Sequence, residues 1–286
     1  MKTVTSVSGG QSSAYIAANY PSDFLVFALV CIEDRACTPK DKKLVQMVSD
    51  RIGREFIATA EDDLILNTMF DLEQYLGQRI DWVVGNTFDQ VIKEKGLLPS
   101  PLRRFCTVEM KLRPMHRWWK NHCLIQEGEP IIMQIGLRAG EEKRANNMLE
   151  RTNEDGFTIM KDVVGQHSSG RNKWAETPWQ KPVFPMIKDG IHRDKVVEFW
   201  KGKPVRFAPR NNCVGCFHRN PILLRQQFDE HPEKMEWFAS KERNRQYEWD
   251  KWSGKEITYD RIGKHRLQFE LSFEDFSECD SGHCGL

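Results

Sequence analysis

Residues 3–19 read TVTSVSGGQSSAYIAAN, and this stretch decides the fold. The first five residues are rich in β-branched side chains and place apolar residues at Val4 and Val7, which predicts a short strand. Gly9 and Gly10 then interrupt the strand, and residues 12–19 are predicted to be helical. A strand that turns directly into a helix is the opening unit of an α/β domain.

The following segments extend this pattern. Residues 24–32 are a continuous apolar run, typical of a strand buried on both faces of a parallel sheet. Residues 41–52 are amphipathic at helical spacing, residues 55–58 are predicted as a third strand and residues 130–135 as a further buried strand. This order predicts an α/β fold with a doubly wound, mostly parallel, Rossmann-like sheet. Further helices are predicted at 62–76, 87–95, 107–121, 194–200 and 221–243, the last with a break near Pro232.

The chain is expected to divide at residue 185. Residues 1–185 form the predicted nucleotide-binding domain, and residues 186–286 form a smaller, mainly helical region that contains cysteines. Residues 153–180 are polar and irregular, which predicts a loop region with a mobile segment at 165–170.

Composition narrows the class of protein. The chain has 286 residues, of which 40% are hydrophobic, enough for a sizeable core. It has no apolar run long enough to span a membrane and no signal-peptide pattern, so a cytoplasmic protein without a membrane partner is expected. Lys and Arg outnumber the acids over residues 188–225, which suits either a phosphate backbone or a solvated face. The Trp-rich residues 237–252 would suit stacking on nucleic acid or packing in a core.

The loop after the first strand has the chemistry of an anion site. The first backbone N–H groups of a helix have no partner within the helix, and the helix dipole favours negative charge there. Glycines let a ligand approach closely, and Ser hydroxyls add donors. The loop lacks the Lys of a Walker A motif, and the plainer interpretation is an ordinary turn with Ser12 as helix cap. The loop residues are Ser8, Gly9, Gly10, Gln11, Ser12 and Ser13.

Three motifs in order resemble one superfamily. Ser-Gly-Gly-x-Ser-Ser after the first strand resembles the pyrophosphate loop of the PP-loop superfamily, the adenine nucleotide α-hydrolases. Arg104-Phe105-Cys106-Thr107 followed by Lys111 looks like the Arg-x-Cys-Thr-x-x-x-Lys element of proteins similar to phosphoadenylyl-sulfate (PAPS) reductases. Residues 136–144, GLRAGEEKR, look like their Gly-Leu-Arg-Ala-x-Glu-x-x-Arg element. The resemblance covers roughly residues 1–220 and points to PAPS-reductase-like proteins of phages and mobile elements.

The resemblance implies roles for these residues. The loop would hold the phosphates of an adenine nucleotide, ATP with Mg²⁺ or PAPS, at the carboxyl edge of the sheet. Arginines bind phosphate or sulfate oxygens in bidentate geometry. The expected phosphate-binding residues outside the loop are Arg104, Glu141 and Arg144, and the expected catalytic residues are Cys106, Lys111 and Arg138.

The cysteines suggest a metal site. Cys213 and Cys216 form a Cys-x-x-Cys knuckle, and Cys279 and Cys284 form a second close pair. Four thiolates suit zinc or an iron–sulfur cluster, and the spacing does not separate the two, or exclude free thiols. Cys106 lies among cationic residues, which would lower the pKa of its thiol and favour the thiolate. It could be a cluster ligand, a sulfur carrier or a small packed side chain at the start of a helix. Two further cysteines flank the expected adenine site: Cys31 is predicted in the core and Cys37 as an exposed thiol.

Three functions fit this pattern. ATP could be cleaved to pyrophosphate while an acceptor is adenylated and then thiolated, although Ser12 stands where ATP-using relatives often carry Asp. A cysteine could instead reduce PAPS, although the C-terminus ends at Cys284-Gly285-Leu286 without the closing His of true reductases. The chain could also be a non-catalytic nucleotide-binding subunit. The expected partners are an adenine nucleotide, a nucleic-acid acceptor or sulfur-donor protein, and a second copy of the chain.

Overall fold

A computed structural model describes residues 1–253 and 257–265. The chain forms two compact units, each assembled from three separate stretches. The first unit contains Met1–Phe27, Asp71–Asp81 and Met115–Val205, and the second contains Ala28–Phe70, Trp82–Pro114 and the described part of Arg206–Leu286. The sequence predicted a single division at residue 185. Contacts between segments far apart in the chain, which local composition does not reveal, define the units.

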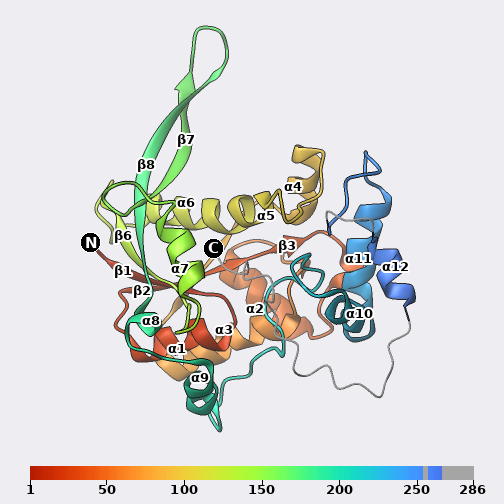
Figure 1. Ribbon diagram of the computed structural model, residues 1–286, viewed down its shortest axis with the longest axis horizontal. Helices are drawn as coiled ribbons and strands as arrows, with labels where there is room; N and C mark the ends of the chain where they lie inside the picture. Colours follow the sequence, from red (N-terminus) through yellow and green to blue (C-terminus); the bar gives the residue numbers. More distant parts are fainter. Residues whose placement is uncertain (254–256, 266–286) are drawn as a thin grey trace. The chain divides into compact units, whose positions relative to one another are not determined.

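The fold is α/β and is built on a six-stranded, mostly parallel sheet with the strand order β5-β2-β1-β6-β8-β7 (Figure 1). Strand β1 pairs in parallel with both β2 and β6, β6 pairs in parallel with β8, and β7 pairs antiparallel with β8. The strand order reverses between β1 and β6. The strands are β1 (Thr3–Val7), β2 (Phe24–Leu29), β5 (Ile80–Val84), β6 (Ile131–Gln134), β7 (Thr158–Gln166) and β8 (Asn172–Val183).

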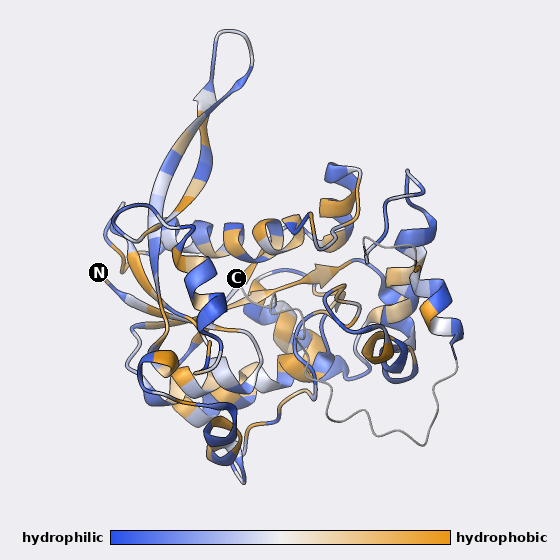
Figure 2. Cartoon of the chain, viewed as in Figure 1, coloured by the Kyte–Doolittle hydropathy of each residue, from blue (hydrophilic) through white to orange (hydrophobic). Residues whose placement is uncertain are grey.

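In the first unit, α1 (Gln11–Asn19) packs on β1 and on α9 (Arg193–Trp200). The rings of Tyr15 and Phe199 meet edge to face with centroids 4.9 Å apart. Trp179 is completely buried, and its ring contacts His116 of α6 (Arg113–Asn121). Figure 2 shows hydrophobic and hydrophilic bands alternating along α6, as expected for an amphipathic helix. The other helices of this part are α7 (Glu142–Leu149) and α8 (Pro185–Lys188), and α3 (Asp63–Leu76) spans the unit boundary.

The second unit has an aromatic core of its own. Trp237, Phe238, Trp252 and Tyr259 are all buried there. The Glu242 carboxylate accepts hydrogen bonds from the backbone N–H groups of Trp252 and Tyr259, so the backbone at these two residues is held to the helix that carries Glu242. Its elements are β3 (Cys31–Ile32), the 3-10 turn η1 (Arg35–Cys37), α2 (Lys42–Ile52), β4 (Ala58–Thr59), α4 (Phe88–Lys95), α5 (Phe105–Thr107), the π-helical turn η2 (Val108–Leu112), α10 (Pro221–Glu230), α11 (Pro232–Arg243) and α12 (Tyr259–Lys264).

Most predicted helices are confirmed, including the break at Pro232 between α10 and α11. The strand and loop predictions are confirmed only in part. The run at 24–32 is divided between β2 and β3, and the expected third strand is reduced to β4, which pairs antiparallel with β3 in a separate two-stranded sheet. The six-stranded sheet instead contains β5, and residues 153–180 hold most of the β7–β8 hairpin rather than a loop. Apolar and polar residues alternate only weakly in β5 and in the β7–β8 hairpin, so the sequence pattern did not predict these strands.

No helix among the described residues is both long and apolar enough to span a lipid bilayer.

Candidate functional site

The loop at residues 8–13 leaves the first turn of a helix open. Gly10 is the helix cap of α1 in extended conformation, and no side chain caps this turn among the described residues. Gly9 has a φ of 83°, in the left-handed region that favours glycine. The Ser13 hydroxyl donates to Gly10 O and accepts from the Ser8 N–H, both at 3.0 Å, and so fixes the loop from inside. The interpretation of Ser12 as helix cap is wrong, because Ser12 lies within α1.

Gly136, the first residue of the Gly-Leu-Arg-Ala motif, packs against that loop. A Cβ atom at Gly136 would lie 2.9 Å from Ser13 N and 3.0 Å from Ser13 Cα. Backbone atoms cannot move aside cheaply, so only glycine fits here. The requirement explains the glycine of the Gly-Leu-Arg-Ala motif in physical terms: it allows the turn after β6 to approach the turn after β1. These two turns flank the point where the strand order reverses, which is where open α/β sheets bind ligands.

Two arginines of this motif are held by one carboxylate. Arg138 donates from its backbone N–H (2.9 Å) and its Nε (3.1 Å) to Glu141 Oε2, and Arg144 donates to Glu141 Oε1. Burial alone would raise the pKa of Glu141, but the Arg138 amide and both guanidinium groups together lower it. Glu141 therefore stays ionised and orients the two arginines. Its own charge would repel a phosphate, so the expected role of Glu141 as a direct phosphate ligand fits this geometry less well than a positioning role.

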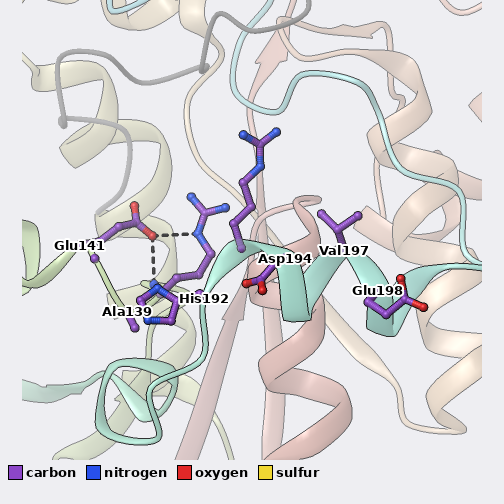
Figure 3. Close-up of a pocket in the computed structure, with 9 residues that line it drawn as sticks. Ala139, Glu141, His192, Asp194, Val197 and Glu198 are labelled. Atoms are coloured by element: carbon purple, nitrogen blue, oxygen red, sulfur yellow. Dashed lines mark hydrogen bonds and ion pairs between the residues drawn. The ribbon is translucent and has the colours of Figure 1, made fainter.

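An open pocket of about 710 Å³ lies beside this motif (Figure 3). The Ala139 N–H donates to Ile191 O at 2.9 Å and joins the motif to the segment that leads into α9. His192 caps that helix without a side-chain hydrogen bond. The pocket is lined by residues 138–141, 192–194, 197 and 198, and its volume lies in the range usual for small-molecule sites.

The second unit contains a buried ion pair. Lys111 Nζ lies 3.0 Å from Glu61 Oε1, and the Glu61 side chain is almost wholly buried. Burial lowers the pKa of Lys111, but Glu61 and the neighbouring Cys213 thiol outweigh it, so the pKa lies above its ordinary value. Lys111 is thus a fixed positive charge and not a proton acceptor. The second oxygen of Glu61, Oε2, is buried without a hydrogen-bond partner in the described structure.

Three thiols gather next to this ion pair. The backbone at Cys213 forms a bridge with Glu61, and Val214 N–H donates to Ala60 O at 2.8 Å. Cys106 lies close enough to Cys216 and Cys213 that charge on one thiol raises the pKa of another. Burial is the main reason that the pKa of Cys106 rises to about 11. Arg104 lowers this pKa, as expected of a cationic neighbour, but burial outweighs it, so the expected net lowering of the Cys106 pKa is wrong.

The predicted four-cysteine site is described only in part. The structure brings Cys213 and Cys216 together on one turn, whereas Cys279 and Cys284 lie outside the described residues. Within residues 1–253 and 257–265, no three His, Cys, Asp or Glu side chains are arranged to hold a metal ion. The described thiols therefore do not by themselves fit zinc or a cluster. Gly215 between them is required by packing, since a Cβ there would lie 2.4 Å from the Phe238 ring.

The two arginines before Cys106, Arg103 and Arg104, differ in their contacts. Arg103 donates to Asp250 at 2.6 Å and lies over the ring of Trp249, so it has a structural partner. Arg104 Nε is buried and makes no hydrogen bond to the rest of the described chain. Such a group is suited to an anionic ligand, which agrees with the role expected for Arg104.

The remaining predictions have mixed outcomes. Cys31 is buried as predicted, but Cys37 is 3% exposed, so the prediction of an exposed thiol there is wrong. Trp237 and Trp252 belong to the core and Trp249 is exposed, so most of the Trp-rich segment serves packing. Sequence reasoning missed Glu61. The signal was its position, since it is an acid two residues after the short strand β4.

Comparison of the chain with protein-family models, with curated proteins and with solved structures finds no match.

Proposed function

We propose that this chain binds an adenine nucleotide through its phosphates at the loop of residues 8–13. The observation that carries the proposal is the uncapped first turn of α1 beside the strand-order reversal between β1 and β6. Free N–H groups at a helix N-terminus favour anions, and open α/β sheets generally bind ligands beside such a reversal of strand order. The resemblance of this loop, and of the motifs around Arg104 and Arg138, to the PP-loop superfamily supports adenine as the base.

The proposed reaction is ATP-dependent transfer. An oxygen of the acceptor attacks the α-phosphorus, a new P–O bond forms, the α–β anhydride breaks and pyrophosphate leaves. A sulfur nucleophile then attacks the acceptor atom that bears the adenylated oxygen, a bond from that atom to sulfur forms, its bond to the oxygen breaks, and AMP leaves with that oxygen. In this scheme the amides of α1 and the Arg138 guanidinium stabilise phosphate charge, and Glu141 positions Arg138. Within the second unit, Glu61 holds Lys111 as a permanent positive charge, and Cys106 is the proposed sulfur carrier.

The cofactor is a separate proposal. Mg²⁺ would accompany ATP, and Cys213 and Cys216 would contribute two ligands to zinc or an iron–sulfur cluster together with Cys279 and Cys284. Metal analysis of protein purified without oxygen tests this: a brown, iron-containing preparation indicates a cluster, a colourless zinc-containing one indicates zinc, and a metal-free one rejects both.

Product analysis separates the possible activities. Protein incubated with ATP and Mg²⁺ is expected to form AMP and pyrophosphate when a suitable acceptor is supplied. Sulfite formed from PAPS and a thiol reductant would instead establish the reductase alternative. Tight nucleotide binding with neither product would favour an accessory subunit, and absence of any nucleotide binding would reject the proposal.

A further inference from the structure

The hairpin of β7 and β8 extends beyond the other strands of the sheet (Figure 1). Its outer half pairs from Lys161 with Glu176 to Gln166 with Asn172, which is roughly 20 Å of two-stranded ribbon at the usual rise per residue. Most residues of this part are exposed on both faces. An isolated two-stranded ribbon is only marginally stable in water, so its length contributes little to the core.

The tip of the ribbon is positively charged. From residue 163 to residue 175 there is no Asp or Glu, while Arg171 and Lys173 are exposed. The two acids nearer the base are already paired: Asp162 with Lys120 at 3.1 Å and Glu176 with Lys161 at 2.9 Å. Neither Arg171 nor Lys173 forms an ion pair with another described residue. The charge that remains at the tip favours an anionic partner.

The turn at the tip is ordered by its own hydrogen bonds. His167 N–H donates to Arg171 O at 2.8 Å, and Gly170 N–H donates to His167 O at 2.9 Å. Gln166 and Asn172 pair beside this turn and add amide groups that can donate to and accept from base edges. The tip thus presents cations and amides together on a defined backbone.

An apolar pair lies behind the turn. Val163 is paired with Trp174 across the two strands, and their side chains are 48% and 53% exposed. The neighbouring Val164 is 54% exposed. Exposed aromatic and aliphatic groups beside unpaired cations suit a polynucleotide, because its sugars and bases offer apolar surface next to phosphates.

We propose that the outer half of the β7–β8 ribbon binds duplex DNA by entering the major groove. The major groove of B-form DNA is about 12 Å wide and admits a two-stranded ribbon, whereas that of A-form RNA is too narrow to be read. Arg171 and Lys173 contact phosphates, and Gln166 and Asn172 face base edges. The idea that duplex DNA is the acceptor of the reaction rests on the proposed function. Binding of DNA by the ribbon does not depend on it and is tested without nucleotide.

The test compares charge variants of the full-length protein. The double variant R171Q/K173Q removes the two tip cations, and K42Q/K43Q removes two exposed cations of α2 as a matched control. Binding to a short fluorescent DNA duplex is measured from 50 to 200 mM salt. Each lost phosphate contact lowers the slope of log affinity against log salt by about 0.9. Wild type and control should therefore lose about tenfold more affinity over this range than the tip variant.

A third variant, W174A, tests the apolar pair without changing charge. It should weaken binding while leaving the salt slope unchanged, and melting temperatures should stay near wild type for all variants because the sites are exposed. The proposal is overturned if wild type does not bind the duplex, if the tip variant keeps the wild-type slope, if the control loses as much, or if duplex RNA or a single strand binds more tightly. ATP binding by the same preparations shows separately whether the nucleotide site is intact.

Discussion

The replacement of Gly136 by alanine tests the nucleotide site through sterics alone. The new Cβ would lie 2.9 Å from Ser13 N and 3.0 Å from Ser13 Cα, whereas carbon atoms normally pack about 3.5–4.0 Å apart. The turn after β6 and the loop at residues 8–13 must therefore separate by roughly half an ångström to one ångström. Overpacking of this kind costs about 1–3 kcal/mol of stability, and no charge or hydrogen-bonding group is removed.

The expected result is a loss of nucleotide affinity. A hydrogen bond to a charged group contributes about 1.5–3 kcal/mol, so displacing one amide donor from a phosphate should weaken ATP binding by about 10- to 100-fold in titration calorimetry. The control is G263A, whose Cβ would lie 2.9 Å from the Phe228 ring in the second unit. It should lower stability by a similar mechanism and leave ATP affinity unchanged. If folded G136A binds ATP as tightly as wild type, or if G263A loses as much affinity, the contact between Gly136 and Ser13 does not control nucleotide binding.

Three further predictions concern stability and reactivity. Glu61→Gln leaves the ammonium of Lys111 without its partner and should destabilise the protein by about 2 kcal/mol in urea unfolding, less than for a fully buried pair because Lys111 is partly exposed. Lys111→Met in the same background should recover part of the lost stability, and no loss of stability in the single variant would contradict the ion pair. Because the pKa of Glu141 is lowered in the folded state, the stability that its ionised carboxylate contributes is complete above the ordinary glutamate pKa and is lost as the pH falls through the lowered folded-state pKa. Between pH 5 and pH 3 the melting temperature of Glu141→Gln should therefore fall less steeply than that of wild type, and equally steep falls would count against this. Burial raises the pKa of Cys37 to about 12, so alkylation at pH 8 followed by peptide mass spectrometry should modify exposed Cys123 much faster, and equal rates would show that Cys37 is accessible.

The sequence predicted the loop because its signal is local. A strand, two glycines and a helix within residues 3–19 determine each other's geometry, and the structure follows that order from β1 to α1. The helices were predictable for the same reason, since one amphipathic turn specifies the next. Gly136 could be recognised as part of a motif. Its contact with Ser13 could not be predicted, because that contact joins turns more than a hundred residues apart.

The features that sequence did not predict depend on distant partners. The motif marked Lys111 as a catalytic residue but could not show that Glu61 lies beside it, and Cys106 was expected to be an activated thiol because its burial was not known. The β7–β8 hairpin was missed because its outer half is polar and exposed on both faces, so it lacks the alternation that marks a half-buried strand. The strand expected at residues 55–58 was predicted for the main sheet because it is apolar, but β4 lies in a small separate sheet with β3.

The most direct test of the nucleotide site is an amide NMR titration of the isotopically labelled protein with ATP and, separately, with inorganic pyrophosphate. If the first turn of α1 binds phosphate, the amide resonances of Gly10, Gln11 and Ser12 should shift most with both ligands, since these N–H groups stand at the uncapped helix start. Shifts confined to other residues, or no shift in these three amides at saturating ATP, would contradict the account.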